Sequence, residues 1–171
     1  NGRDLTQFKR WYAQAGTPRV TAAARHDAAA GILELTLSQS TAPTPGQPSK
    51  EPFHIPIAVG LVGSDGGDIP LQLEGEPSAR GTTRVLDLTR AAQTFRFTNV
   101  PPAVVPSLLR GFSAPVTVDA PLDDRDLAFL AAHDSDPFNR WEAGQKMATA
   151  RLMALTDAVE AGQPLGLDEP F

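Results

Sequence analysis

The spacing of hydrophobic residues changes several times along the chain. The first stretch places large apolar side chains on one helical face: Leu5, Phe8, Trp11 and Tyr12. This spacing predicts a short helix over residues 4–15, with Asp4 as its N-cap and Gly16 and Pro18 ending it. Three turns cannot be stable alone, so we expect Trp11 to be a packing anchor against another element.

From residue 19 the apolar period becomes two, which is typical of half-buried strands. The pattern predicts eight short strands, near residues 20–24, 33–37, 53–61, 69–73, 84–88, 94–99, 107–112 and 115–119. The turn at residues 64–67 predicts that the third and fourth strands form a hairpin. Residues 42–52 contain four prolines and are expected to form an exposed, mobile loop. Strands without a crossover helix between them predict an antiparallel sandwich.

Helical spacing returns at Asp123, where acidic residues suit the first turn of a helix. Asp136 and Pro137 mark the start of a second helix, which Gly162 and Pro164 end. The residues that follow at three- and four-residue steps are Phe138, Trp141, Gln145, Ala148, Leu152, Leu155 and Val159, with Trp141 expected to be a packing anchor. The predicted fold is mainly β with α ends: an immunoglobulin-like antiparallel β-sandwich of seven to eight strands, flanked by one N-terminal and two C-terminal helices.

Composition narrows the possible chemistry. The 171 residues include no cysteine, which excludes disulfides, a thiolate zinc site and a cysteine nucleophile. A net charge of -5 argues against a nucleic-acid binder, and no apolar run is long enough to span a membrane. The chain begins with Asn1 rather than methionine and has no signal-peptide pattern, so we expect it to be part of a longer protein.

The candidate metal ligands do not form a recognisable pattern. His26, His54 and His133 are each isolated, and H-E-x-x-H is absent. Two acidic groups were considered as calcium ligands: Asp65 with Asp68, and Asp123 with Asp124 and Asp126. The first lacks the spacing of a calcium loop, and the second fits helix initiation better. We therefore expect no metal site in this chain.

Catalytic motifs are also missing. G-x-S-x-G does not occur around Ser64 or Ser113, and residues 60–67 lack the ending of a phosphate-binding loop. A carboxylate pair for glycoside hydrolysis stays open, but no aromatic-rich cleft accompanies it. We assign no catalytic and no cofactor-binding residue.

Three stretches resemble one enzyme family. FKRWYAQAGTP at 8–18, PSLLRGFSAPV at 106–116 and DPFNRWEAGQ at 136–145 are similar, in order and spacing, to segments of the bacterial alanyl aminopeptidases, also called aminopeptidase N. Residues 54–56, 65–66 and 69–71 agree more weakly. The family belongs to the gluzincin-type zinc metallopeptidases, and the resemblance extends from residue 4 to about 155.

This resemblance implies a fragment of a longer enzyme with four domains. Residues 1–17 would be the last helix of the catalytic domain, 18–120 the β-sandwich domain and 121–171 the first helices of the C-terminal helical domain. The parent would be a cytoplasmic zinc enzyme that removes N-terminal amino acids from peptides. Its zinc ligands and general base would lie upstream, so we expect this chain to be inactive alone. Its partners would be the parent's catalytic and helical domains, without nucleic acid or membrane.

Two functions from different classes follow. In the first, the sandwich is a non-catalytic connection between the catalytic and helical domains, and it sets the angle that gates peptide entry. In the second, the chain is an autonomous immunoglobulin-like binding module for protein or carbohydrate. The flanking helices favour the first, because a binding module has no need of helices that lack partners.

Overall fold

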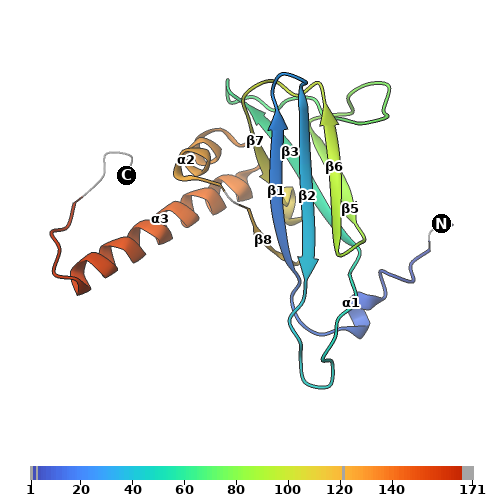
Figure 1. The fold of residues 1–171 in the computed structure, drawn as a ribbon, viewed down its shortest axis with the longest axis horizontal. Coiled ribbons are helices and arrows are strands. Elements are labelled where there is room, and N and C mark those ends of the chain that lie inside the picture. Colours follow the sequence, from blue (N-terminus) through green and yellow to red (C-terminus); the bar gives the residue numbers. More distant parts are fainter. Residues whose placement is uncertain (1, 3, 121, 167–171) are drawn as a thin grey trace.

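The computed structural model describes residues 2, 4–120 and 122–166, and the statements below concern these residues. The predicted domain start at residue 121 and the end of the chain, 167–171, lie outside them. The strands lie in two sheets facing each other, with α1 at one end and two helices at the side (Figure 1). The predicted fold class, mainly β with helices at the ends, is confirmed.

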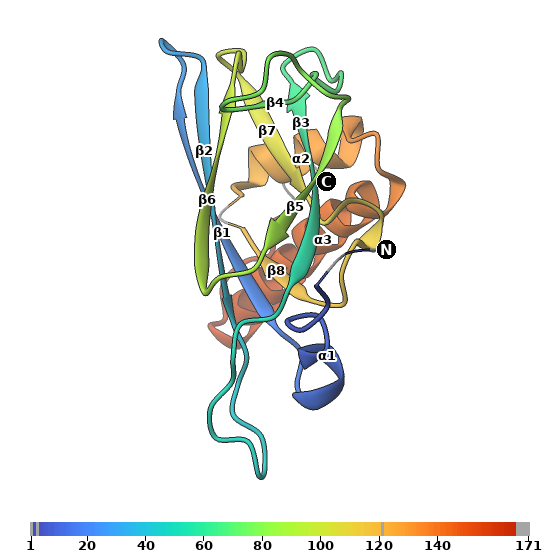
Figure 2. The ribbon, with the colours of Figure 1, turned by 90° about the vertical axis from the view of Figure 1, so that its right-hand side faces the viewer.

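Eight strands form the sandwich within the described ranges: β1 (Arg19–Asp27), β2 (Ile32–Ser40), β3 (Ile55–Gly63), β4 (Gln72–Leu73), β5 (Thr83–Leu88), β6 (Ala92–Thr98), β7 (Val104–Leu108) and β8 (Thr117–Asp119). One sheet has the order β4-β6-β2-β1-β8 and the other the order β5-β3-β7. Figure 2 shows the two layers edge on and side by side, with β3 and β5 to the right of β6 and β2. Alternating apolar side chains fill the space between them, including Val20, Leu35, Ile57, Leu86 and Phe97.

Three strand predictions are wrong in detail. The turn at 64–67 does return the chain beside β3, where Val62 pairs with Asp68 and the Ile69 N–H donates to the Leu61 carbonyl. The predicted pairing stops there, because the chain then crosses to the other sheet, where β4 pairs with β6. The sandwich is not wholly antiparallel, because β8 pairs with β1 in parallel. The strand predicted over residues 107–112 ends at Leu108. The first two differences share one reason: alternation identifies which side chains are buried, but it does not select the strand that pairs with them. The third arises because the backbone turns left-handed at Leu109, directly after β7.

The N-terminal helix is much shorter than predicted. Turns occupy residues 6–9 and α1 covers only Arg10–Ala13, while Asp4 accepts a hydrogen bond from the Thr6 N–H at 2.8 Å rather than capping α1. Trp11 alone of the predicted stripe packs on the sandwich core, with its ring 4.5 Å from that of Phe53. Tertiary contacts rather than helix length hold this segment.

The two C-terminal helices begin as predicted. α2 (Asp124–His133) starts at the N-cap Asp123, which accepts from the Asp126 N–H, and α3 (Pro137–Glu160) starts at the N-cap Asp136 with proline in its first turn. α2 packs along β7 and the N-terminal half of α3, whereas the rest of α3 extends away from the sandwich (Figure 1). No helix of the described residues is long and apolar enough to cross a membrane.

Candidate functional site

The most highly organised polar site in the described structure centres on Arg110. After β7 the backbone turns through left-handed conformations at Leu109, Gly111 and Phe112, within the short 3-10 helix η1 (Arg110–Phe112). This turn directs Arg110 inward, and only 5% of the residue stays exposed. A buried guanidinium must be hydrogen-bonded and paired with carboxylates.

The sandwich supplies most of the partners of Arg110. Its Nη1 and Nη2 donate to the two carboxylate oxygens of Asp68 at 2.8 and 2.7 Å, a bidentate pair. Nε donates to Ser107 Oγ at 2.8 Å, and Nη1 also reaches Thr83 Oγ1 at 3.1 Å. These residues come from β7, the β3–β4 connection and β5, so one side chain joins three parts of the fold.

A glycine provides the floor of this site. A Cβ on Gly60 of β3 would lie 2.0 Å from the Arg110 Cζ atom, so the guanidinium rests directly on the β3 backbone. No side chain other than hydrogen fits there without moving Arg110.

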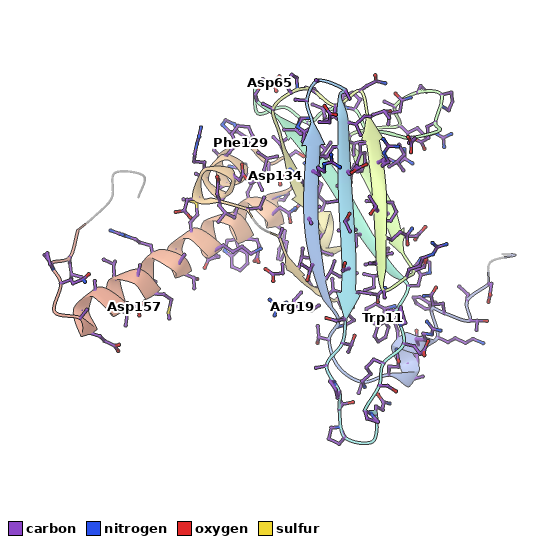
Figure 3. All side chains as sticks on the ribbon, viewed as in Figure 1. Trp11, Arg19, Asp65, Phe129, Asp134 and Asp157 are labelled. Atoms are coloured by element: carbon purple, nitrogen blue, oxygen red, sulfur yellow. The ribbon has the colours of Figure 1, made fainter. Side chains whose placement is uncertain are left out.

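The helices reach the same site through the α2–α3 connection. Asp134, whose side chain is fully buried, accepts from Arg110 Nη2 at 3.1 Å, and Ser135 Oγ donates to Asp68 at 2.6 Å. Asp136 caps α3 through the Asn139 N–H and also accepts from the Gly111 N–H at 2.8 Å. Figure 3 shows Asp134 between the helices and the sheets.

Asn139 completes the junction. Its side-chain Nδ2 donates to Ser107 Oγ and to the Leu108 carbonyl, both at 2.9 Å. The N-terminus of α3 is therefore bonded to β7, to η1 and, through Asp134, to Arg110. We call the set Asp68, Ser107, Arg110, Asp134, Ser135, Asp136 and Asn139 the arginine junction.

Electrostatics favour the ionised form of the arginine junction. The hydrogen bonds from Arg110 outweigh burial and, with the Ser135 hydroxyl, hold the pKa of Asp68 below its ordinary value. Burial opposes the charge of Arg110, yet the carboxylates of Asp68, Asp134 and Asp136 keep its pKa above the usual range. The Ser107 hydroxyl is buried and the exposed Ser135 hydroxyl donates to Asp68, so the site provides a fixed connection between the sandwich and the helices.

A second junction holds the N-terminal segment. The Trp11 indole donates to the His54 carbonyl at 2.9 Å, and Gln7 donates to the carbonyls of Pro52 and Thr89. Gln14 and Glu51 exchange two hydrogen bonds between side chain and backbone. Figure 1 shows the long β2–β3 connection beside α1.

This connection is the proline-rich loop predicted to be exposed and mobile. Gln47 receives the Ala15 N–H and donates to the Ala13 carbonyl, and Lys50 binds the Ala15 carbonyl. The loop is largely exposed, but these bonds fix its course against the N-terminal segment.

The structure keeps the three histidines apart in different surroundings. His26 lies at the end of β1, His54 Nε2 contacts Asp87 Oδ1 at 2.7 Å, and the His133 ring packs on Phe129 at 4.8 Å. Within residues 2, 4–120 and 122–166, no three metal-binding side chains come together in a group that could hold an ion. These residues do not fit the ligand set of a catalytic zinc.

The acidic candidates have structural partners. Asp65 accepts from the Gly67 N–H in the turn after β3, and Asp68 belongs to the arginine junction. Asp123 caps α2, and burial followed by the charge of Asp123 raises the pKa of Asp126. Asp124 lies in the first turn of α2.

Sequence reasoning missed the arginine junction. Its signal was present: Arg110 is a single charge within the apolar run Leu108, Leu109 and Phe112, in a stretch interpreted as a strand. A lone charge among residues expected to be buried indicates either an outward-facing position or a buried ion pair. Which carboxylates would meet it could not be read from the sequence.

Comparison with known families agrees with this architecture. A family described as "Domain of unknown function (DUF3458) Ig-like fold" matches residues 16–121. The chain belongs to this family of Ig-like domains. A second family, described as "Domain of unknown function (DUF3458_C) ARM repeats", matches residues 124–171.

Three curated relatives of the chain have the same name. It is 42% identical to Aminopeptidase N of Escherichia coli over 96% of its length, and 48% identical to Aminopeptidase N of Caulobacter vibrioides over 97%. Aminopeptidase N of Haemophilus influenzae is 35% identical over 96% of the chain. The chain spans only 18% of the length of each of these proteins. The resemblance to aminopeptidase N seen in the sequence is confirmed.

A solved structure agrees as well. The crystal structure of Legionella pneumophila aminopeptidase A in complex with aspartic acid matches with a TM-score of 0.75 and 25% identity. The match covers 99% of this chain and 17% of that protein. Two of the resembling stretches, 106–116 and 136–145, contribute Ser107, Arg110, Asp136 and Asn139 to the arginine junction.

Proposed function

We propose that this chain is the Ig-like domain, with the first helices of the following domain, of a longer aminopeptidase of the aminopeptidase N type. The similarity to three such proteins over nearly the whole chain, and over 18% of their length, supports this proposal. By the family resemblance, the longer protein is a cytoplasmic zinc enzyme that removes N-terminal residues from peptides. No step of that hydrolysis is assigned to the residues described here.

The role of this chain is a non-catalytic connection that fixes the helical domain relative to the catalytic domain. The observation that carries it is the arginine junction, where Arg110, Asp68 and Asp134 join the sandwich to the α2–α3 connection. Such a buried network holds one arrangement, because a shifted helix pair would leave charges unpaired. The N-terminal junction attaches the segment that would end the catalytic domain. By holding the angle between domains, the chain controls peptide entry to the catalytic site.

The alternative, an autonomous binding module, is less well supported. α3 exposes Trp141, Leu152, Met153 and Val159, each more than half exposed in this chain. Such apolar surface is expected of a helix that packs on a neighbouring domain. The predicted anchor role of Trp141 is therefore wrong for contacts within this chain.

The test uses the full-length protein and two arginine substitutions. Arg110→Met removes the junction, whereas Arg96→Met removes a partly exposed arginine of β6 that pairs with Glu34 and Glu74. We expect Arg110→Met to change the ratio of long-peptide to dipeptide turnover about fivefold, a coupling of about 1 kcal/mol. Arg96→Met should leave it unchanged.

Two results would contradict the proposal at different levels. A folded Arg110→Met protein with an unchanged ratio would refute the angle-setting role. A full-length protein with no upstream H-E-x-x-H motif and no release of N-terminal residues would refute the aminopeptidase assignment itself.

A further inference from the structure

An apolar pocket lies beside the arginine junction. It has a volume of about 260 Å³, is lined by β7, η1, β8, α2 and the first half of α3, and opens to solvent. Its apolar walls include Leu108, Val116, Leu127, Leu130, Phe138 and Ala143. Glu142 and Lys146 form an ion pair at 3.5 Å and are the charged residues of its lining. Its apolar walls lack dispersion partners in this chain, so an apolar side chain that filled the pocket would be stabilising.

The pocket continues into the unpartnered face of α3. One side of α3 packs on α2 and the sandwich through Asn139, Ala143 and Met147. A different side carries the exposed residues Phe138, Trp141, Leu152 and Val159, whose spacings of 3, 11 and 7 positions keep them on one helical face. Phe138 belongs to the pocket and to the exposed face of α3, since it lines the pocket and its ring lies 5.9 Å from that of Trp141.

The sandwich contributes its own exposed aromatic residue to this surface. Phe112 of η1 is 54% exposed, lines the pocket and packs on Phe138 at 5.7 Å. Anything that covers the face of α3 near Phe138 therefore meets the sandwich as well as the helices.

The structure and the comparisons favour one occupant. Residues 124–171 match a family of ARM repeats, in which helix pairs stack so that each repeat covers the next. α3 has 24 residues, a length of about 36 Å. The helix ends at Glu160, with Ala161 as its C-cap. Gly162 follows in a left-handed conformation, which lets the chain leave the helix axis. A helix that follows residue 171 and returns antiparallel along α3 would have its far end at Phe138 and Phe112.

We propose that this returning helix, a segment of the longer protein after residue 171, covers the exposed face of α3 and inserts an apolar side chain into the pocket. The inference rests on the proposed function, since it requires the longer protein. It adds a direct contact between the sandwich and a third helix, next to the arginine junction. The helical domain is then held on the sandwich by two adjacent sets of contacts: the polar arginine junction and the apolar side chain inserted into the pocket.

Thiol labelling in the full-length protein tests this inference. The chain has no cysteine, so single cysteines placed in it need only a full-length background in which any cysteines outside these 171 residues are replaced by serine. Glu142→Cys lies at the pocket, and its side chain is 41% exposed in this chain. Thr21→Cys, on the polar outer face of β1, is the matched exposed control.

We expect the thiol at position 142 to react at least about tenfold more slowly than that at position 21 in the native protein, and equally fast in urea. Equal native rates would overturn the inference. Protection lost on dilution would indicate a second copy, and protection lost after passage over a hydrophobic resin would indicate a diffusible apolar ligand; both overturn it. Aminopeptidase activity is read separately, so failure of the proposed function is distinguishable.

Discussion

The two junctions of this molecule hold their segments by different physical means. At the N-terminal junction, amide side chains, the Trp11 indole and the Lys50 ammonium donate to backbone carbonyls at exposed or partly exposed positions, most of these bonds being neutral. At the arginine junction, a guanidinium with 4% side-chain exposure meets two carboxylates, one of them fully buried. The first joins a short segment to a loop, and the second joins two folded layers.

The difference concerns how each junction fails. Neutral hydrogen bonds at partly exposed sites contribute about 1 kcal/mol each and can be replaced by water when broken. Buried charges cannot be released singly, because the remaining partner would stay desolvated without a counter-charge. We infer that the hydrogen bonds of the N-terminal junction can break one at a time, whereas the contacts of the arginine junction break together.

The largest expected effect is that of Arg110→Met. It leaves Asp68 and Asp134 beside an apolar side chain, and should lower the free energy of unfolding by about 3–5 kcal/mol. Arg96→Met, which breaks partly exposed pairs with Glu34 and Glu74, should cost about 1 kcal/mol or less. Urea denaturation measures both. Similar losses for the two variants would remove the contrast between buried and exposed pairs.

Gly60→Ala disturbs the packing of the arginine junction without removing any charge. The new methyl group would overlap the Arg110 guanidinium, so we expect a loss of about 2–3 kcal/mol. Gly144→Ala on α3, where an added Cβ meets nothing within 4 Å, is the matched control and should be neutral or stabilising. Thermal unfolding measures the stability of both variants. A Gly60→Ala protein as stable as the unsubstituted one would show that Arg110 can move away from β3.

At the N-terminal junction, Trp11→Ala should cost about 2 kcal/mol. It removes the ring contact with Phe53 and leaves the His54 carbonyl without its indole donor. Tyr12→Ala, at a side chain that is 84% exposed, should change stability by less than about 0.5 kcal/mol. Chemical denaturation compares them, and equal losses would mean that Trp11 does not anchor the segment.

The smallest expected effect comes from Glu76, in the connection after β4. The bidentate bond from Arg84, with the Leu73 N–H, lowers the pKa of Glu76 from 4.5 to about 2. Because the folded-state pKa is depressed, this contribution is complete above pH 4.5 and disappears as the pH falls to about 2. Glu76→Gln should therefore reduce the loss of unfolding free energy between pH 4.5 and about 2, measured by urea denaturation at several pH values. An unchanged pH dependence over this range would contradict the pairing of Glu76 with Arg84.

The sequence was most informative where the determinants were local. Asp123 and Asp136 mark the starts of α2 and α3 because a cap depends on neighbouring residues. Alternation located β1, β2, β3, β5 and β6 for the same reason. It did not reveal that β4 would pair with β6, since that choice depends on residues 20 or more positions away.

The arginine junction shows the same limit more sharply. Asp68, Arg110 and Asp134 are separated by 42 and 24 positions, and each has an ordinary interpretation by itself: a turn residue, a strand residue and a helix end. The resemblance to aminopeptidase N marked two of the stretches that meet there, but it assigned them no role. Only the folded chain brings them together.

The central claim, that the arginine junction fixes the helices relative to the sandwich, is open to a distance measurement. Spin labels are placed at Thr21→Cys on β1 and at Asp157→Cys near the end of α3 in the full-length protein. Figure 3 shows Asp157 far from the sheets, so the distance between the two labels reports the position of α3 relative to the sandwich. We predict one narrow distance distribution with Arg110 present and a broad or shifted one after Arg110→Met. An unchanged narrow distribution in the folded variant would contradict the claim.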